Sequence, residues 1–216
     1  MIPRNHDLQY TPKSRKINPT MKIYCEGDTE YYYFQYLRSV LRFNNLNIIP
    51  VKTKEAQTQL ITIVEETIIR EGINSDSEDS VWCVIDVEEN KQNWGSTIKK
   101  INQFQDNKNK FVIISNPSFE VWLLSFFRYS TKRYTNSELC DELTKLLNVK
   151  NYSRDIKGRN IVKYIDYFKD VKKAIDNSQK QIKFHKDQDR DLLEFESNPL
   201  TQIYLILEKL QVKDIK

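Results

Sequence analysis

Three short segments of the sequence place acidic side chains directly after apolar stretches that have the length of β-strands. Glu26 follows the run KIYC, Asp86 and Glu88 follow the run VWCVI, and Glu120 stands shortly after FVII. Carboxylates that are brought together repel one another unless a cation neutralises them. Oxygen ligands that no cysteine or histidine accompanies suit Mg2+ or Mn2+ better than Zn2+. The pattern therefore predicts a divalent-metal site that Glu26, Asp86 and Glu88 would ligate.

Such a site would suit the cleavage of phosphodiester bonds, which requires charge neutralisation on the phosphate and an activated water molecule. Gly27 is expected to let the backbone turn sharply after Glu26 and approach a phosphate. Each acid taken alone has another interpretation, as a solvated strand end or, for Glu120, as a favourable charge in the first turn of a helix. A catalytic imidazole is not expected, because His6 lies in a polar N-terminal segment and His185 in a charged stretch that reads as a loop.

The elements that must position these acids alternate between short apolar runs and amphipathic patterns. We predict strands at 22–26, 46–51, 80–86 and 110–114, and helices at 29–43, 55–70, 96–105 and 117–128, the last with Asn116 as its cap and Pro117 at its first position. This alternation indicates an α/β fold with a mostly parallel, doubly wound sheet flanked by helices. Ligands bind such sheets at the carboxyl ends of the strands, so the acidic segments should meet at one edge.

The chain changes character after the fourth predicted strand and its helix. Amphipathic helices are predicted at 136–147, 160–177 and 199–210, separated by polar, lysine-rich stretches. We therefore divide the chain into a polar tail at 1–20, an α/β domain at 21–130 and a helical C-terminal extension at 131–216 that packs on the domain.

Composition narrows the class of protein further. The 216 residues carry a net charge of +4 and contain only four glycines, and they show neither a dinucleotide-binding GxGxxG nor a Walker loop. No apolar run approaches the roughly 20 residues of a membrane helix, and no secretory signal is recognisable. Three cysteines without metal-type spacing favour free thiols, so a cytoplasmic protein is expected.

Basic residues interleaved with tyrosines gather in the second half of the chain. Two groups are the candidates for binding nucleic acid: Arg128, Lys132 and Arg133, and then Arg154, Lys157 and Arg159. Cations can bind phosphates while neighbouring aromatic rings stack on bases. The other interpretation is a lysine-rich helical surface on which the tyrosines serve packing.

The stretches IYCEGDTEYYYFQYL, VWCVIDVEEN, SNPSFEVWLL and SNPLTQIYLILEKL, in this order over residues 21–210, resemble the RloB family of bacterial restriction-associated and abortive-infection proteins. The order strand, Glu, Gly, helix and then strand, acid, x, acid is similar to the Toprim domain of topoisomerases, primases and OLD-family nucleases. The resemblance implies a Toprim-like sheet, with Glu26 as general base or acid, Asp86 and Glu88 as ligands of Mg2+ or Mn2+, and Glu120 as a further catalytic acid. Glu88 stands where the family pattern has aspartate, and its additional methylene group moves the carboxylate outward.

Two functions follow as expectations. The first is a metal-dependent nuclease that acts on DNA or RNA in anti-phage defence. The second is a non-catalytic regulatory module that binds metal or nucleotide and serves a partner ATPase, which the family association implies. Primase-like polymerisation would use the same acids in the reverse chemistry, but no further nucleotide-handling domain is recognisable. No membrane association is expected, and tyrosine-rich helices are compatible with a homodimer.

Overall fold

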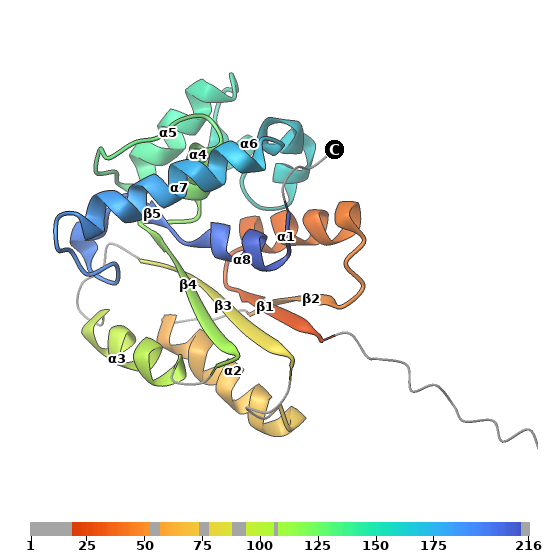
Figure 1. The fold of residues 1–216 in the computed structure, drawn as a ribbon. Helices are drawn as coiled ribbons and strands as arrows, with labels where there is room; N and C mark the ends of the chain where they lie inside the picture. The colour runs from red at the N-terminus through yellow and green to blue at the C-terminus, as the bar shows by residue number, and fades with distance from the viewer. Residues whose placement is uncertain (1–18, 52–56, 74–77, 88–93, 106–107, 213–216) are drawn as a thin grey trace, which may run out of the picture.

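A five-stranded sheet forms the centre of the computed structural model, which describes residues 19–51, 57–73, 78–87, 94–105 and 108–212 (Figure 1). The strand order is β2-β1-β3-β4-β5. The strands are β1 (Met21–Cys25), β2 (Leu46–Pro50), β3 (Ser80–Asp86), β4 (Lys110–Asn116) and β5 (Leu200–Thr201). The first four strands pair in parallel, and only β5 runs antiparallel, on the outer edge of β4. The predicted α/β class and the mostly parallel sheet are confirmed.

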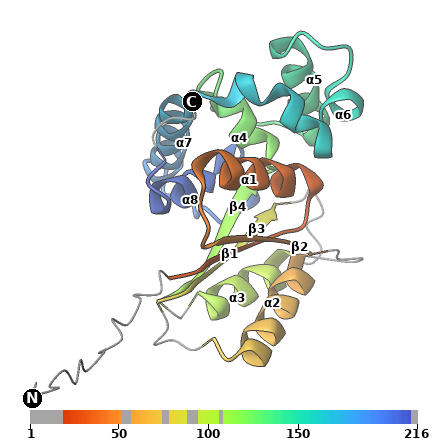
Figure 2. The same ribbon diagram turned by 90° about the vertical axis from the view of Figure 1, so that its right-hand side faces the viewer.

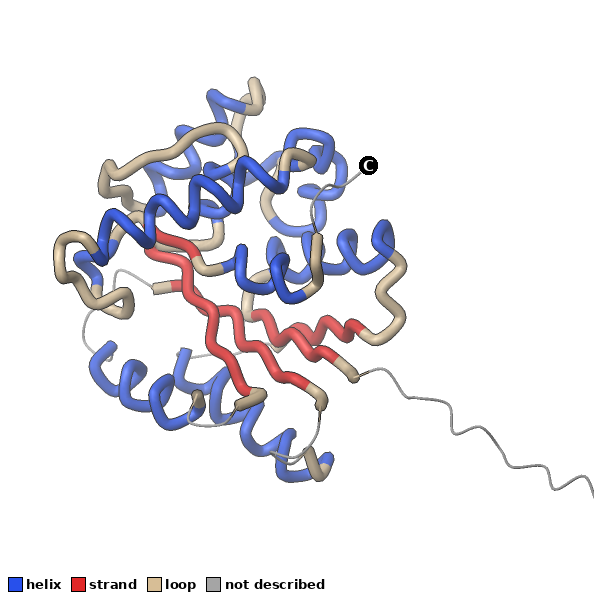
Figure 3. The backbone as a smooth tube through the Cα atoms, in the orientation of Figure 1, coloured by secondary structure: helices blue, strands red, loops and turns tan. Residues whose placement is uncertain are grey.

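Helices cover both faces of the sheet, as Figures 2 and 3 show. Helices α2 (Gln57–Glu71) and α3 (Trp94–Phe104) pack on one face. The other face carries α1 (Asp28–Leu41), α4 (Glu120–Ser125), the 3-10 helix η2 (Gly158–Phe168), α7 (Val171–Lys186) and α8 (Ile203–Lys209). Helices α5 (Asn136–Leu146) and α6 (Tyr152–Asp155) complete this second layer, and the short η3 (Phe195–Ser197) precedes β5.

Alternation along the central strand shows why both layers are needed. On β3, Trp82 and Val84 lie in the core shared with α1 and α4, whereas Cys83 and Ile85 lie in the core shared with α2 and α3. Successive side chains of a strand point to opposite faces, so a continuous apolar run is the sequence of a strand that is buried on both sides. The same alternation directs Asp86 towards the α1 and α4 face.

The predicted helix at 117–128 begins later than expected. Asn116 ends β4, and its side-chain amide donates to the carbonyl oxygens of Glu194 (3.0 Å) and Phe195 (3.4 Å) instead of capping a helix. Helix α4 starts at Glu120, three residues after Pro117. A side chain that serves a distant part of the chain cannot be recognised from local sequence, which is why the capping pattern was misleading.

The C-terminal half also differs from the helices predicted for it. Residues 200–201 form β5 where a single helix at 199–210 was expected, and the region 160–177 divides into η2 and α7. The two SNP sequences consequently become neighbours, since Ser115 pairs with Thr201 and Asn116 with Leu200. The residues assigned to a helical extension therefore contribute a strand to the sheet. Among the described residues, no helix has the length and apolar character that crossing a membrane requires.

Candidate active site

The order of the strands creates a switch point between β1 and β3. The chain leaves β1 through α1 to reach β2 on one side, and then returns through α2 to β3 on the other side. Helices α1 and α2 lie on opposite faces, so a crevice opens at the carboxyl ends of β1 and β3, where open α/β sheets bind their ligands. Glu26 directly follows β1, and Asp86 is the last residue of β3.

A cavity of about 380 Å³ lies at this edge of the sheet and brings together segments that are distant in sequence. Asp86 from β3, Glu30 from the first turn of α1 and Glu120 from the start of α4 line it, together with Lys157, which immediately precedes η2. The remaining lining residues are Gly27, Asp28, Thr29, Ser153 and Gly158. Two predicted acids, Asp86 and Glu120, thus share one cavity with two acids that were not predicted, Asp28 and Glu30, and with a cation.

Glu120 is the most completely bonded acid of the site. Its side chain is almost fully buried, and its Oε2 accepts a hydrogen bond from Ser118 Oγ at 2.7 Å. Its Oε1 accepts from the Tyr152 hydroxyl at 3.3 Å and lies 3.2 Å from the Lys157 ammonium. Hydrogen bonds and a counter-ion offset the free-energy cost of burying a carboxylate. Glu120 therefore fixes the positions of its neighbours as well as lining the cavity.

Glu30 and Asp86 lie in a much less favourable environment for charge. Burial raises the pKa of Glu30 to about 7, with Glu120 and Glu26 adding repulsion and Lys157 opposing it. Burial likewise raises the pKa of Asp86 well above its ordinary value, and the carboxylates of Glu30 and Glu120 add to this effect. The Oδ1 atom of Asp86 is buried and has no hydrogen-bond partner among the described residues. The cavity thus brings together acidic groups whose negative charges repel one another unless a cation or a proton binds there.

Lys157 is the cation that the structure places among these acids. Burial by itself lowers the pKa of the Lys157 ammonium, but the Glu120 carboxylate outweighs this effect, and the pKa is raised overall. Gly158, in the left-handed conformation at φ 72°, follows Lys157 and donates its backbone N–H to Thr29 Oγ1 at 2.8 Å. This bond ties the start of η2 to the first turn of α1, which keeps the ammonium at the cavity.

Gly27 has a different role from the sharp turn that was predicted. Its backbone is extended, at φ −88° and ψ 145°, a conformation that any residue adopts. The space that a Cβ atom would occupy is taken by the Glu30 side chain, because an added Cβ would lie 2.7 Å from Glu30 Cδ. Glycine at this position leaves the room in which the Glu30 carboxylate folds over the end of β1.

Gly27→Ala should therefore push the Glu30 carboxylate out of its place and lower the free energy of unfolding by about 1 kcal/mol, or a few degrees in Tm. Gly95→Ala in α3 is the matched control, since nothing lies within 4 Å of its added Cβ. We expect the control to raise Tm slightly, because alanine is the better helix former. Thermal unfolding of the two variants measures the difference, and an equal response at both positions would contradict this role for Gly27.

The donor chemistry of the cavity fits a hard divalent cation, because carboxylate oxygens line it and one of them is buried with no hydrogen-bond partner in the described part of the chain. Among the residues that the structure describes, however, no three acidic, histidine or cysteine side chains lie close enough to hold a metal ion between them. Glu88, the predicted partner of Asp86, lies outside the described residues. Binding of Mg2+ or Mn2+ therefore stays a prediction, and Asp86 is the described residue that best supports it.

The cations predicted to bind nucleic acid differ in their surroundings. Three of them are paired with carboxylates: Arg128 with Glu142 (2.5 Å), Lys132 with Glu138 (3.3 Å) and Arg154 with Asp155 (2.7 Å). Lys157 belongs to the acidic cavity, as described above. Arg133 and Arg159 form no ion pair with a described carboxylate. The contact of any of these residues with nucleic acid stays a prediction.

Sequence reasoning did not identify Glu30, Ser118 or Tyr152 as parts of the site. Glu30 was counted within an amphipathic helix, although its position four residues after Glu26 and three after Gly27 places it in the first turn beside the acids. Ser118 stands two residues before Glu120, within the same SNPSFE segment that was singled out. Tyr152 reaches the site only through the tertiary fold, and no local sequence pattern indicates its contact with Glu120.

His185 was assigned to a charged loop, but the structure places it in α7 with no exposed surface. Its Nε2–H donates to the carbonyl oxygen of Pro199 at 3.0 Å, which leaves Nδ1 to accept from the Arg190 guanidinium at 3.4 Å. Burial and the neighbouring Arg190 charge lower the pKa of the imidazole, although its bond to Pro199 opposes the shift. His185 is thus a neutral structural residue rather than a catalytic one.

His185 should therefore contribute less stability as pH decreases below about 6.5, the ordinary histidine pKa. The unfolded chain takes up a proton on His185 in this range, whereas the folded chain resists it, so the stabilisation present above pH 6.5 is lost. Glu30 and Asp86 act in the opposite direction, because burial raises the pKa of each. The measurement therefore compares denaturant unfolding of the wild type and His185→Gln at pH 5 and pH 7, and we expect the wild type to lose about 1 kcal/mol relative to the variant at the lower pH. An equal pH dependence of the two proteins would contradict this role of His185.

A family model described as RloB-like protein matches residues 21–210 of the chain. The match covers all five strands, both helical layers and every described residue of the acidic cavity. The chain matches no curated protein and no solved structure.

Proposed function

The chain belongs to the RloB-like family, and from this premise we propose that it is a metal-dependent nuclease that hydrolyses phosphodiester bonds of DNA or RNA in bacterial defence against phage. One observation carries the proposal. Asp86 and Glu120, from separate segments of the chain, line the same cavity at the switch point of the sheet, and Asp86 holds a buried oxygen atom that no described residue hydrogen-bonds. The resemblance of Glu26, Asp86 and Glu88 to the acids of Toprim enzymes supports the same reaction class.

Each residue has a role in this reaction. Asp86 and Glu88 would hold Mg2+ or Mn2+, which would supply charge neutralisation for the phosphate and an acidified water. Glu26, beside Gly27 at the end of β1, accepts the proton of the attacking water as the bond from phosphorus to the leaving oxygen breaks. Lys157 binds a phosphate oxygen of the substrate, and Glu120 positions the Lys157 ammonium for this contact.

The test is incubation of the purified protein with Mg2+ or Mn2+ and with plasmid, single-stranded DNA or transfer RNA. The proposal expects cleavage of at least one substrate, its loss on chelation of the metal, and its loss in Glu26→Gln without a change in the circular dichroism spectrum. Cleavage that persists in the presence of chelator, or that Glu26→Gln leaves unchanged, would argue against this mechanism.

The second candidate function is a regulatory module that binds a metal ion or nucleotide for a partner ATPase without catalysis. The ion pair between Lys157 and Glu120 favours it, because an ammonium already compensates part of the charge that a catalytic metal would neutralise. Metal-dependent binding of nucleotide or nucleic acid without cleavage of any substrate would favour the module over the nuclease.

A further inference from the structure

A second cavity, of about 290 Å³, lies beside the start of β5, past the carboxyl end of β4. Arg133, Arg190 and Phe184 line it together with Thr131, Glu196 and Asn198. Its place in the fold follows from the pairing of β5, in which Leu200 lies opposite Asn116, the last residue of β4. Because β5 runs antiparallel, Asn198 precedes Leu200 and so lies past the carboxyl end of β4. The acidic cavity and this one therefore open at the same edge.

Arg133 is held at this edge through its neighbour in the chain. Asn198 Oδ1 accepts a hydrogen bond from the Tyr134 backbone N–H at 2.9 Å, and Asn198 Nδ2 donates to the Tyr134 carbonyl oxygen at 2.7 Å. This reciprocal pair joins the segment after α4 to the residue that precedes Pro199 and β5. The Tyr134 ring is buried beneath it, so the backbone that carries Arg133 has a fixed position while the Arg133 side chain stays exposed.

Arg190 contacts the same short segment, residues 196–199, both directly and through His185. Its guanidinium lies 3.4 Å from His185 Nδ1, and Nε2 of the same imidazole donates to the Pro199 carbonyl oxygen. The guanidinium also donates to the Glu196 carbonyl oxygen at 3.4 Å and lies over the Phe184 ring, 5.9 Å from its centroid. Two arginines from separate parts of the chain are thus anchored to residues 196–199, immediately before β5.

No carboxylate of the described residues pairs with either of these two guanidiniums. The contacts of Arg190 are a neutral imidazole, a carbonyl oxygen and an aromatic ring, and neither arginine forms an ion pair with a carboxylate of the described residues. Glu196 is the one acidic side chain among the lining residues, so the cations outnumber it. Guanidiniums without a counter-ion recognise phosphate oxygens, and a neighbouring ring offers a face for a base.

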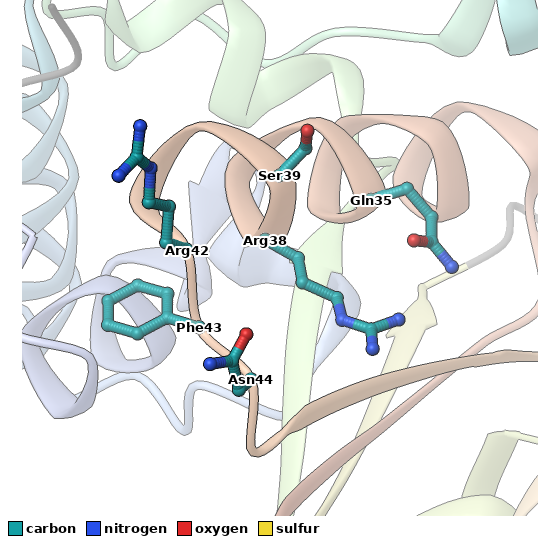
Figure 4. A pocket seen from close by; sticks show the side chains of 6 residues that line it. All are labelled: Gln35, Arg38, Ser39, Arg42, Phe43 and Asn44. Atoms are coloured by element: carbon teal, nitrogen blue, oxygen red, sulfur yellow. The ribbon is translucent and has the colours of Figure 1, made fainter.

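A third cavity, of about 430 Å³, also contains two arginines, but its geometry is different. Arg38 and Arg42 line it at the C-terminal end of α1, with Gln35, Ser39, Phe43 and Asn44. Figure 4 shows the two guanidiniums extending in different directions from the helix. Helix α1 runs away from the carboxyl edge, so these arginines lie at the opposite edge of the sheet from the acids. They provide a control with the same charge rather than a second site.

We propose that the Arg133 and Arg190 cavity binds a backbone phosphate of a single nucleic-acid strand whose scissile phosphate lies at the acidic cavity. This inference rests on the proposed nuclease function, because it assigns the path of that substrate along the sheet edge. Asp86, Ser115 and Thr201 lie side by side on β3, β4 and β5, and two strand spacings of about 4.8 Å separate the first from the last. A strand of a few nucleotides spans such a distance, and single-strand sites commonly cover about 4–16 nucleotides.

Binding can be measured separately from cleavage. Fluorescence anisotropy of a labelled oligothymidylate of about 12 nucleotides, in chelator and at several salt concentrations, reports affinity without hydrolysis. Arg133→Ala should weaken binding about 5- to 10-fold and reduce the slope of log K against log salt by roughly 0.7, the value for one lost phosphate contact on a single strand. Arg190→Lys, which keeps the charge but not the planar fork, should weaken binding about 2- to 5-fold.

Two controls make the outcome decisive. Lys183→Ala removes a cation of α7 that is already paired with Asp187, and Arg38→Ala with Arg42→Ala removes two charges at the opposite edge. Both controls should bind within about twofold of wild type. Equal loss in the controls, or an unchanged salt slope in Arg133→Ala, overturns the proposed phosphate site. Absence of cleavage by a wild type that shows the expected binding pattern would instead count against the nuclease alone.

Discussion

Asp86→Asn should reduce the rate of metal-dependent cleavage by about 1,000-fold or more. The same substitution should raise the free energy of unfolding in metal-free buffer. The loss of activity follows from removing the carboxylate that best supports a bound cation. The gain in stability follows from burial, which raises the pKa of Asp86 and so makes its anion unfavourable in the folded chain. Asparagine keeps the shape of the side chain but has no charge to desolvate.

The pH dependence of the stability gain has a definite sign. Above the ordinary aspartate pKa of about 3.9, the unfolded chain releases the proton of Asp86 while the folded chain resists its release, so the wild type is destabilised. The difference between the variant and the wild type should be present at pH 7 and disappear as pH falls towards 4. Chemical denaturation at these two pH values measures it.

The matched control for this prediction is Asp79→Asn, one residue before the start of the same strand. Asp79 lies at the opposite edge of the sheet, where its Oδ1 accepts a hydrogen bond from the Thr20 N–H. An amide oxygen can accept the same bond, so we expect unchanged cleavage. Full cleavage activity in Asp86→Asn, or an equal loss of cleavage activity in both variants, would show that the acidic cavity is not the site of the reaction.

Lys157→Met should make the stability of the protein depend on divalent metal. The ammonium of Lys157 is the cation that pairs with Glu120 and opposes the repulsion on Glu30 and Asp86. Its removal leaves the carboxylates without this compensation, which should cost about 1–2 kcal/mol at pH 7, a moderate value because the lysine side chain is half exposed. Mg2+ should restore most of this loss, because a divalent ion supplies the missing positive charge.

Thermal unfolding with and without Mg2+ tests this prediction. Lys163→Met is the control, since Lys163 lies on the exposed side of η2. The control should unfold as the wild type does and should gain no more from Mg2+. Lys157→Met should also reduce cleavage about 10- to 100-fold if the ammonium binds the substrate phosphate. A variant with wild-type stability and an ordinary response to Mg2+ would show that Lys157 does not compensate the acids.

The parallel part of the fold could be predicted from the sequence because its signals are local. The run SVWCVID matches β3 at both ends, and the amphipathic pattern over 136–147 matches α5 to within one residue. Helix α5 also carries a capping box in which Thr135 and Glu138 bond reciprocally, a signal contained in four residues. Such elements are decided by burial and capping within the segment itself.

The C-terminal half was harder to predict because its elements depend on distant partners. Residues 200–201 form a strand only because the edge of β4 offers a place to pair, and Ser115 Oγ and Thr201 Oγ1 share a hydrogen bond across 86 positions. The same is true of the acidic cavity. Two predicted acids meet there, but the need for Lys157 as a counter-ion and for Gly27 as space for Glu30 arises only in three dimensions.

Strand β5 has a consequence for any shortened form of this protein. A fragment that stops before Ser197 loses the outer neighbour of β4 and leaves that strand with unsatisfied backbone donors and acceptors. Open edges of this kind recruit strands from other molecules, so the fragment should self-associate in proportion to its concentration. Strand β5 thus protects the carboxyl end of β4, at Ser115 and Asn116, from pairing with another molecule.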